Sequence, residues 1–242
     1  MVSTIEFIWK GSELFYSANF MFEALFIIMA IAISFFSYKA YKFTQKNNYF
    51  YLFLSFLLLS IAYLIRIVDN IIFFLRDVGA GIMQAIASSQ AFYSIIAILY
   101  LVLVIFSYLI LLISFQKITN KRTVILLYTI AFLLVISSYK TIGIFYLTSA
   151  VLLFFVIEHL FRNYEKNKNT STFLLFFSFL LMFIVQILSL LFKMGLVARF
   201  DNLTFSVLQL VLLLSYAIIV ATLIRIFQRR ESPEKVKKQK IK

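Results

Sequence analysis

The chain has 242 residues, of which 63% are hydrophobic and 14% are charged. Soluble domains carry about 25% charged residues, and a globule of this size cannot bury so much apolar surface. The composition therefore excludes a soluble globular protein and, for the same reason, an intrinsically disordered chain. The formal net charge of +13 would suggest nucleic-acid binding in a soluble protein. Here it first indicates which side of a membrane the basic residues occupy.

The sequence has no cysteine, one histidine (His159) and one proline (Pro233). Disulfides, thiolate chemistry, iron–sulfur clusters and Cys-based zinc sites are therefore excluded. A haem held by two histidines of this chain is excluded as well. Transporters often break helices at Gly or Pro near mid-membrane. This chain has only 5 glycines and its one proline lies in the tail, so a transporter with broken helices is disfavoured. We expect neither a cofactor nor a metal.

Apolar runs of about 20 residues, long enough to cross a bilayer, recur along the chain. The predicted spans are Asn19–Tyr41, Tyr49–Ile72, Ala91–Phe115, Thr123–Ser138, Ile142–Phe161, Thr170–Met194 and Thr204–Phe227. The prediction is an all-α, polytopic membrane protein with a seven-helix bundle at residues 19–227. A short N-terminal arm at 1–18 and a basic tail at 228–242 complete it. The arm has acidic residues and no apolar run, so it is not expected to be a cleaved signal.

The basic residues alternate between connections as the positive-inside rule requires. With the N-terminus outside, 17 of the 23 Lys and Arg fall on the inner side and 6 fall outside. The 17 inner residues are Lys39, Lys42, Lys46, Lys117, Lys121, Arg122, Arg162, Lys166, Lys168, Arg225, Arg229, Arg230, Lys235, Lys237, Lys238, Lys240 and Lys242. Against 4 inner acidic residues they account for the whole net charge. The pattern predicts a cell-membrane protein with its N-terminus outside and its C-terminus in the cytoplasm.

The tail clusters its lysines around Pro233, and we expect it to lack regular structure. Its predicted role is topogenic and electrostatic, through contact with anionic lipid worth about 1 kcal/mol per basic residue near the surface. Nucleic-acid binding is not expected, because no soluble domain presents the charge.

A few polar residues inside the spans form the candidate site. Glu23 lies near the outer end of the first span, Gln186 near the middle of the sixth, and Lys193 at the outer end of the sixth. Arg66 and Asp69 are three residues apart on the second span, so they share a helix face and can pair. An ionisable group in hydrocarbon is costly, so each is expected to be paired or functional.

Two main interpretations of these residues are open. In one, Arg66, Asp69 and Lys193 reach the outer headgroups, while Glu23 and Gln186 form interhelical hydrogen bonds of about 1 kcal/mol. In the other, they line a polar cavity that is open to the outside and binds a small ligand. A continuous ion or proton path is a third possibility, but the inner halves of the spans contain no acid to continue it.

A weak repeat places Ser55, Ala131 and Ser178 at the start of similar Phe–Leu–Leu motifs in the second, fourth and sixth spans. Each motif follows a short basic turn, so the pattern predicts three helical hairpins joined on the inner side, plus a seventh helix. The alternative is chance recurrence in a chain rich in Phe and Leu.

Signatures of metalloproteases, serine hydrolases and P-loop enzymes are absent from the sequence. The helix count resembles those of microbial rhodopsins and G-protein-coupled receptors. However, Thr204–Phe227 contains no lysine for a retinal Schiff base, and the prolines and disulfide typical of the receptors are missing. Neither family is supported beyond its helix count.

The stretch SYKAYKFTQKNNYFYLFLSFLLLSIAYLI, at Ser37–Ile65, resembles the first hairpin of small archaeal and bacterial seven-helix membrane proteins. Some of these stand alone, and others form the sensor half of histidine kinases. The resemblance implies a sensor-like or orphan membrane module, and no kinase domain follows Phe227, so a separate partner protein would carry a signal. The Phe/Ile/Lys/Asn bias suggests an AT-rich genome, which would suit an archaeon, a low-GC bacterium or an organelle.

Taken together, the residues and the resemblance predict a non-enzymatic, receptor-like membrane protein. It would bind a small ligand or a partner in the outer half of the bundle. One alternative is a subunit or assembly factor of a larger membrane complex. Another is a small transporter or channel.

Overall fold

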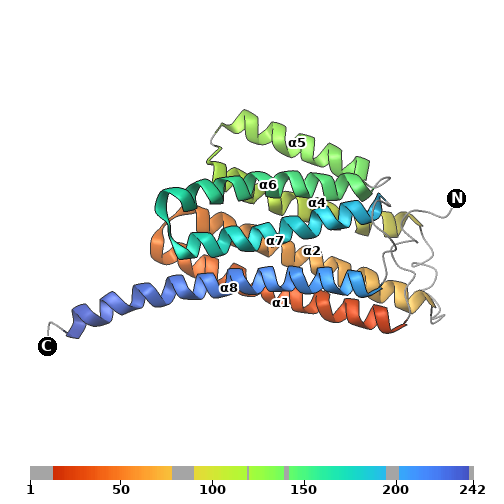
Figure 1. The fold of residues 1–242 in the computed structure, drawn as a ribbon. Helices are drawn as coiled ribbons and strands as arrows, with labels where there is room; N and C mark the ends of the chain where they lie inside the picture. The colour runs from red at the N-terminus through yellow and green to blue at the C-terminus, as the bar shows by residue number, and fades with distance from the viewer. Residues whose placement is uncertain (1–12, 78–89, 119, 139–141, 195–201, 240–242) are drawn as a thin grey trace.

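The computed structural model describes the backbone of residues 13–77, 90–118, 120–138, 142–194 and 202–239, and the side chains of 20–71, 94–118, 120–138, 142–194 and 204–226. Within these ranges the chain forms seven α-helices and no strand (Figure 1). The helices are α1 (Glu13–Thr44), α2 (Asn47–Asp77), α4 (Gln90–Gln116), α5 (Lys121–Ser138), α6 (Ile142–Asn167), α7 (Thr170–Lys193) and α8 (Asn202–Gln239). The predictions for residues 1–12, for most of the connection 73–90 and for 240–242 lie outside the described residues.

All seven helices are long and apolar enough to cross a membrane. Their most apolar windows have mean hydropathies from 1.6 in α5 to 3.0 in α4. Runs of this kind become helices in a bilayer, because a helix satisfies every backbone N–H and C=O without water. The predicted seven-helix, all-α membrane bundle is thus confirmed, while the orientation of its ends stays a prediction from charge.

Every helix except α7 extends beyond its predicted span, and α1 and α8 extend furthest. Helix α1 begins at Glu13, so the last part of the predicted N-terminal arm is helical. Helix α8 continues through Pro233 to Gln239 and projects beyond the other helices (Figure 1). The expectation that the tail lacks regular structure was therefore wrong for 228–239. The Arg, Glu, Lys and Gln residues of this segment are strong helix formers, and together they outweigh the single proline.

Six of the helices close a ring. Helix α1 packs on α2, α2 on α4, α4 on α6, α6 on α7, α7 on α8, and α8 returns to α1. Helix α5 stands outside this ring, packed only on α4 and α6 among the described helices, and Figure 1 shows it at the edge of the bundle. Its buried side chains are correspondingly few and small, namely Ala131, Val135 and Ser138.

Three short connections lie at one end of the bundle, which we call the hairpin end; the opposite end is the far end. The turns follow Thr44, Gln116 and Asn167, and each begins with a non-glycine residue at positive φ: Gln45 at 53°, Lys117 at 54° and Lys168 at 44°. This left-handed conformation is the common way to end a helix, because it turns the next N–H back onto a free carbonyl. Gln45 and Lys168 donate to the carbonyls of Tyr41 and Tyr164 at 2.8 and 2.7 Å.

Small residues let the helices of the ring approach closely. Ser55 on α2 is buried and donates a hydrogen bond of 2.9 Å to the carbonyl of Ser107 on α4. Ser34 on α1 donates to the carbonyl of Phe53 on α2 at 3.2 Å. Without a hydrophobic force between helices in lipid, such close packing and interhelical hydrogen bonds hold membrane helices together.

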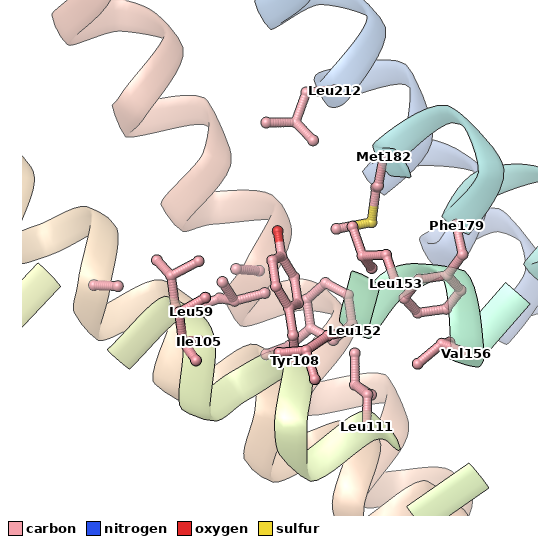
Figure 2. Close-up of a cluster of buried hydrophobic side chains, with 14 of the residues drawn as sticks. Leu59, Ile105, Tyr108, Leu111, Leu152, Leu153, Val156, Phe179, Met182 and Leu212 are labelled. Carbon is pink, nitrogen blue, oxygen red and sulfur yellow. The ribbon is translucent and has the colours of Figure 1, made fainter. Parts of the chain in front are cut away.

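Large side chains fill the ring interior. Figure 2 shows Tyr108 of α4 surrounded by Leu59 of α2, Leu152 and Leu153 of α6, Met182 of α7 and other apolar residues. Tyr108 is 2% exposed, and Leu59, Leu153 and Met182 are fully buried. The interior of the ring is therefore a packed core in which the few polar groups need partners of their own.

Candidate functional site

The buried carboxylate of Glu23 is the centre of a polar cluster near the far end of the bundle. Glu23 is 3% exposed, on the face of α1 that packs against α2. Its Oε1 lies 2.7 Å from Nε of Arg66 on α2, and Asn70, one turn further along α2, donates to its Oε2 at 2.5 Å. Two residues of α2 thus hold one carboxylate of α1.

Helix α4 contributes the next member of the cluster. The guanidinium of Arg66 donates a hydrogen bond of 3.2 Å to the hydroxyl of Tyr100, and its carbon lies 5.4 Å from the centre of the same ring. Tyr146 on α6 also lies within electrostatic range of Arg66. The cluster therefore draws on four consecutive helices of the ring, and the stacked guanidinium gains cation–π attraction as well as charge pairing.

Asp69 is the last member of the cluster, and one of its carboxylate oxygens lacks a hydrogen bond to the described residues. It interacts electrostatically with both Arg66 and Glu23, yet its buried Oδ1 accepts no hydrogen bond from any described residue. The sequence spacing suggested that Arg66 would pair with Asp69. Instead the ion pair of Arg66 within the described residues is with Glu23 on the neighbouring helix.

A second polar group lies deeper, inside the ring. The hydroxyls of Tyr63 on α2 and Tyr216 on α8 are 3.2 Å apart, and both side chains are buried. The amide of Gln186 on α7 is within hydrogen-bonding reach of the hydroxyl of Tyr108. The two hydroxyls of Tyr63 and Tyr216 pair in a region where an unpaired hydroxyl is costly, whereas the buried Oε1 of Gln186 has no hydrogen-bond partner among the described residues. We call these four residues the tyrosine group.

The structure brings together three of the five sequence-predicted site residues, Glu23, Arg66 and Asp69. Gln186 belongs to the tyrosine group, and Lys193 lies exposed at the end of α7, without an ion pair to any carboxylate that the structure describes. Sequence reasoning missed Tyr63, Tyr100, Tyr108 and Tyr216. A tyrosine inside an apolar span could have pointed to them. The chain has 14 tyrosines, however, and the sequence does not show which four lie in the interior.

The described residues contain no group of three or more His, Asp or Glu side chains that could hold a metal ion. Two acids and one arginine lie close together at the Glu23 cluster, with amide and phenol groups beside them. Such a set can orient a small polar ligand through charge and hydrogen bonds. It lies in the outer half of the bundle if the predicted orientation holds.

His159 is apart from both groups. It lies on α6 towards the hairpin end, partly exposed, with its ring 5.8 Å from that of Phe115.

Comparisons of the chain with protein-family models, with curated proteins and with solved structures find no match. The resemblance of Ser37–Ile65 to sensor-type seven-helix modules therefore stays a prediction.

Proposed function

We propose that this protein is a receptor-like membrane module that binds a small cationic ligand at the Glu23 cluster. The observation that carries the proposal is Oδ1 of Asp69, which is buried beside an ion pair and accepts no hydrogen bond from the described residues. A buried carboxylate oxygen without a donor is costly. A ligand with a protonated amine supplies both the donor and the charge.

The charges of the cluster favour a cation over an anion. Glu23 and Arg66 neutralise each other at 2.7 Å, and Asp69 adds a further acid that interacts with both. Among the described side chains of the cluster, two carboxyl groups and one guanidinium leave a formal charge of −1, which a proton or a bound cation neutralises. In a low-dielectric setting an anionic ligand would raise this imbalance and a cationic ligand removes it.

The position of the cluster suits a receptor. The cluster residues come from α1, α2, α4 and α6, so a bound ligand would change the contacts among four helices at once. Tyr63 lies one turn from Arg66 on α2, and its hydroxyl reaches α8 through Tyr216. A ligand that prefers one arrangement of these helices shifts the population towards it. A separate signalling partner would read that shift, as the resemblance to sensor modules implies.

The test is thermal stability of the purified protein in detergent with methylammonium, choline or putrescine as cationic probes and acetate as an anionic probe. We expect at least one cationic probe to raise the melting temperature and acetate to have no effect. A ligand at 100 times its Kd stabilises by about 2.7 kcal/mol. The isosteric Asp69→Asn variant should lose the shift, and Glu158→Gln, which removes a partly exposed acid paired within α6, should keep it.

Equal shifts in Asp69→Asn and the unchanged protein would refute the proposal, and so would the absence of any cation-dependent shift. Uptake of the stabilising probe into proteoliposomes would instead support the alternative that the protein is a transporter. Purification as a stable complex with another membrane protein, in place of a monomer, would favour the subunit alternative.

A further inference from the structure

A groove of about 560 Å³ lies between α2 and α5, in the half of the bundle next to the hairpin end. It exists because α2 and α5 both pack on α4 but, within the described residues, not on each other. Ile110 and Ile113 of α4 form its floor, with Tyr51 on one wall and Val124 and Tyr128 on the other. Its volume is within the range of small-molecule sites, about 300–1,000 Å³.

The end of the groove at the hairpin end is basic. Lys121, the first residue of α5, lines the groove and is exposed. It forms no ion pair with any carboxylate that the structure describes. The sequence from 78 to 157 contains no Asp or Glu, whereas Lys117 and Arg122 stand within four residues of Lys121. Neither α4 nor α5 therefore supplies a counter-charge to the positive charge at this end of the groove.

Two phenol groups lie deeper in the groove. Tyr51 and Tyr128 come from opposite walls and are close enough to interact electrostatically. The ring of Tyr128 packs edge-on against Phe106 at 5.1 Å, which fixes its position. Along α5, Lys121 and Tyr128 are about 10 Å apart at 1.5 Å per residue. From the hairpin end inwards, the groove is thus lined first by the cation of Lys121 and then by the hydroxyls of Tyr51 and Tyr128. The isoleucines of α4 form its floor.

We propose that this groove binds one anionic phospholipid. The phosphate lies against Lys121, the ester groups accept hydrogen bonds from Tyr51 and Tyr128, and an acyl chain covers the isoleucines of α4. The order of cation, donors and hydrocarbon matches the order of phosphate, ester and acyl chain in the lipid. The hairpin end is also the end that carries the excess of Lys and Arg, where anionic headgroups concentrate. A zwitterionic lipid fits the same groove, but its positive headgroup gains nothing from Lys121.

The experiment measures lipid binding to the full chain in dodecyl maltoside. Dioleoyl-phosphatidylglycerol or dioleoyl-phosphatidylcholine is added, bound lipids are counted by native mass spectrometry, and the melting temperature is recorded. We expect one tightly bound phosphatidylglycerol. Lys121→Gln should lower its affinity about fivefold, as loss of one basic residue near a lipid surface does. The matched control is Arg122→Gln, the adjacent exposed cation, which does not line the groove and should change the affinity by less than twofold.

A second variant tests the hydrocarbon part. Val124→Trp fills the groove and should displace the bound phosphatidylglycerol, with melting in phosphatidylcholine showing that the variant folds. Equal binding of the two lipids by the unchanged protein would overturn the proposal, and so would equal losses in Lys121→Gln and Arg122→Gln. Stabilisation by glycerol 3-phosphate alone, equal to that by the lipid, would show a free-phosphate site and would also overturn it.

Discussion

The hydroxyl oxygens of Tyr63 on α2 and Tyr216 on α8 lie 3.2 Å apart, although 153 residues separate them in the sequence. The two helices are not neighbours in the ring, because α1 stands between them. Phe26 of α1 fills the space beside the pair, with its ring centre 5.2 Å from that of Tyr63 and 5.6 Å from that of Tyr216. This hydrogen bond therefore crosses the ring interior and ties its two sides together.

Removal of either hydroxyl of this pair should weaken the fold. We expect Tyr63→Phe and Tyr216→Phe each to cost about 0.6 kcal/mol, the mean for hydrogen bonds between membrane helices, and at most about 1.7 kcal/mol. The double variant should cost little more than either single variant, because one bond is lost in all three. Unfolding in mixed micelles with added SDS, followed by circular dichroism, measures these values. Additive losses would contradict the bond, and Tyr38→Phe, an exposed tyrosine, is the control.

Breaking the ion pair between Glu23 and Arg66 should cost more. Glu23→Gln removes the carboxylate that lies 2.7 Å from the guanidinium of Arg66, whose side chain is 20% exposed. Loss of one partner of a buried pair costs about 3–5 kcal/mol, and the partial exposure of Arg66 places this case at the lower end. The double variant Glu23→Gln/Arg66→Gln should recover part of the loss, since it removes both charges of the ion pair and leaves Asp69 as the one carboxyl group of the cluster. The same unfolding assay tests both.

The exposed ion pair of α6 is the matched comparison. Glu158 and Arg162 are four residues apart, and their side chains are 35% and 70% exposed. Exposed helical pairs contribute about 0.3–0.5 kcal/mol, so Glu158→Gln should change stability by no more than this. A loss in Glu158→Gln equal to that in Glu23→Gln would show that burial of Glu23 does not determine its contribution.

The turn between α6 and α7 should tolerate glycine better than lysine. Lys168 has φ at 44°, a conformation that costs a residue with a Cβ about 1 kcal/mol relative to glycine. We expect Lys168→Gly to stabilise the protein by up to about 1 kcal/mol in the unfolding assay. Lys168→Ala removes the same charge but keeps the Cβ, so it should show no gain. A gain in both variants would assign the effect to charge.

The orientation of the bundle can be tested directly, because the chain contains no cysteine. The charge pattern predicts that the hairpin end faces the cytoplasm. In intact cells, Gln45→Cys should resist a membrane-impermeant maleimide until the membrane is permeabilised. Met194→Cys, at the far end and 62% exposed, should react at once. The opposite labelling pattern would invert the predicted topology and place the Glu23 cluster in the inner half.

The number of helices and the position of their apolar cores were predictable, because a long apolar run with few charges can cross a bilayer. Thr123–Ser138 is the shortest predicted span, and α5 covers Lys121–Ser138. The ends were less predictable where polar residues continue a helix. The continuation of α8 to Gln239 is an example, because the propensities of Lys, Glu and Gln and the presence of Pro233 point in opposite directions.

The partners of the buried charges were not predictable. Residues three apart on one helix share a face by geometry alone, so the pairing of Arg66 with Asp69 was a local inference. Glu23 became the partner of Arg66 because α1 and α2 pack with these two faces together, and the rotation of a helix about its axis depends on all of its neighbours. The contact between Tyr63 and Tyr216 likewise requires the closed ring, which no local pattern specifies.

The closure of the ring by α1 and α8 has a consequence for biosynthesis. The first and last of the described helices are neighbours in the ring. A chain emerging from the ribosome can therefore assemble α1 to α7, but the ring closes only after α8 has entered the bilayer. Until then the hydroxyl of Tyr63 lacks Tyr216, and the flank of α1 that later meets α8 is open to lipid or to a chaperone. Completion of the interior is thus a late, post-insertion event.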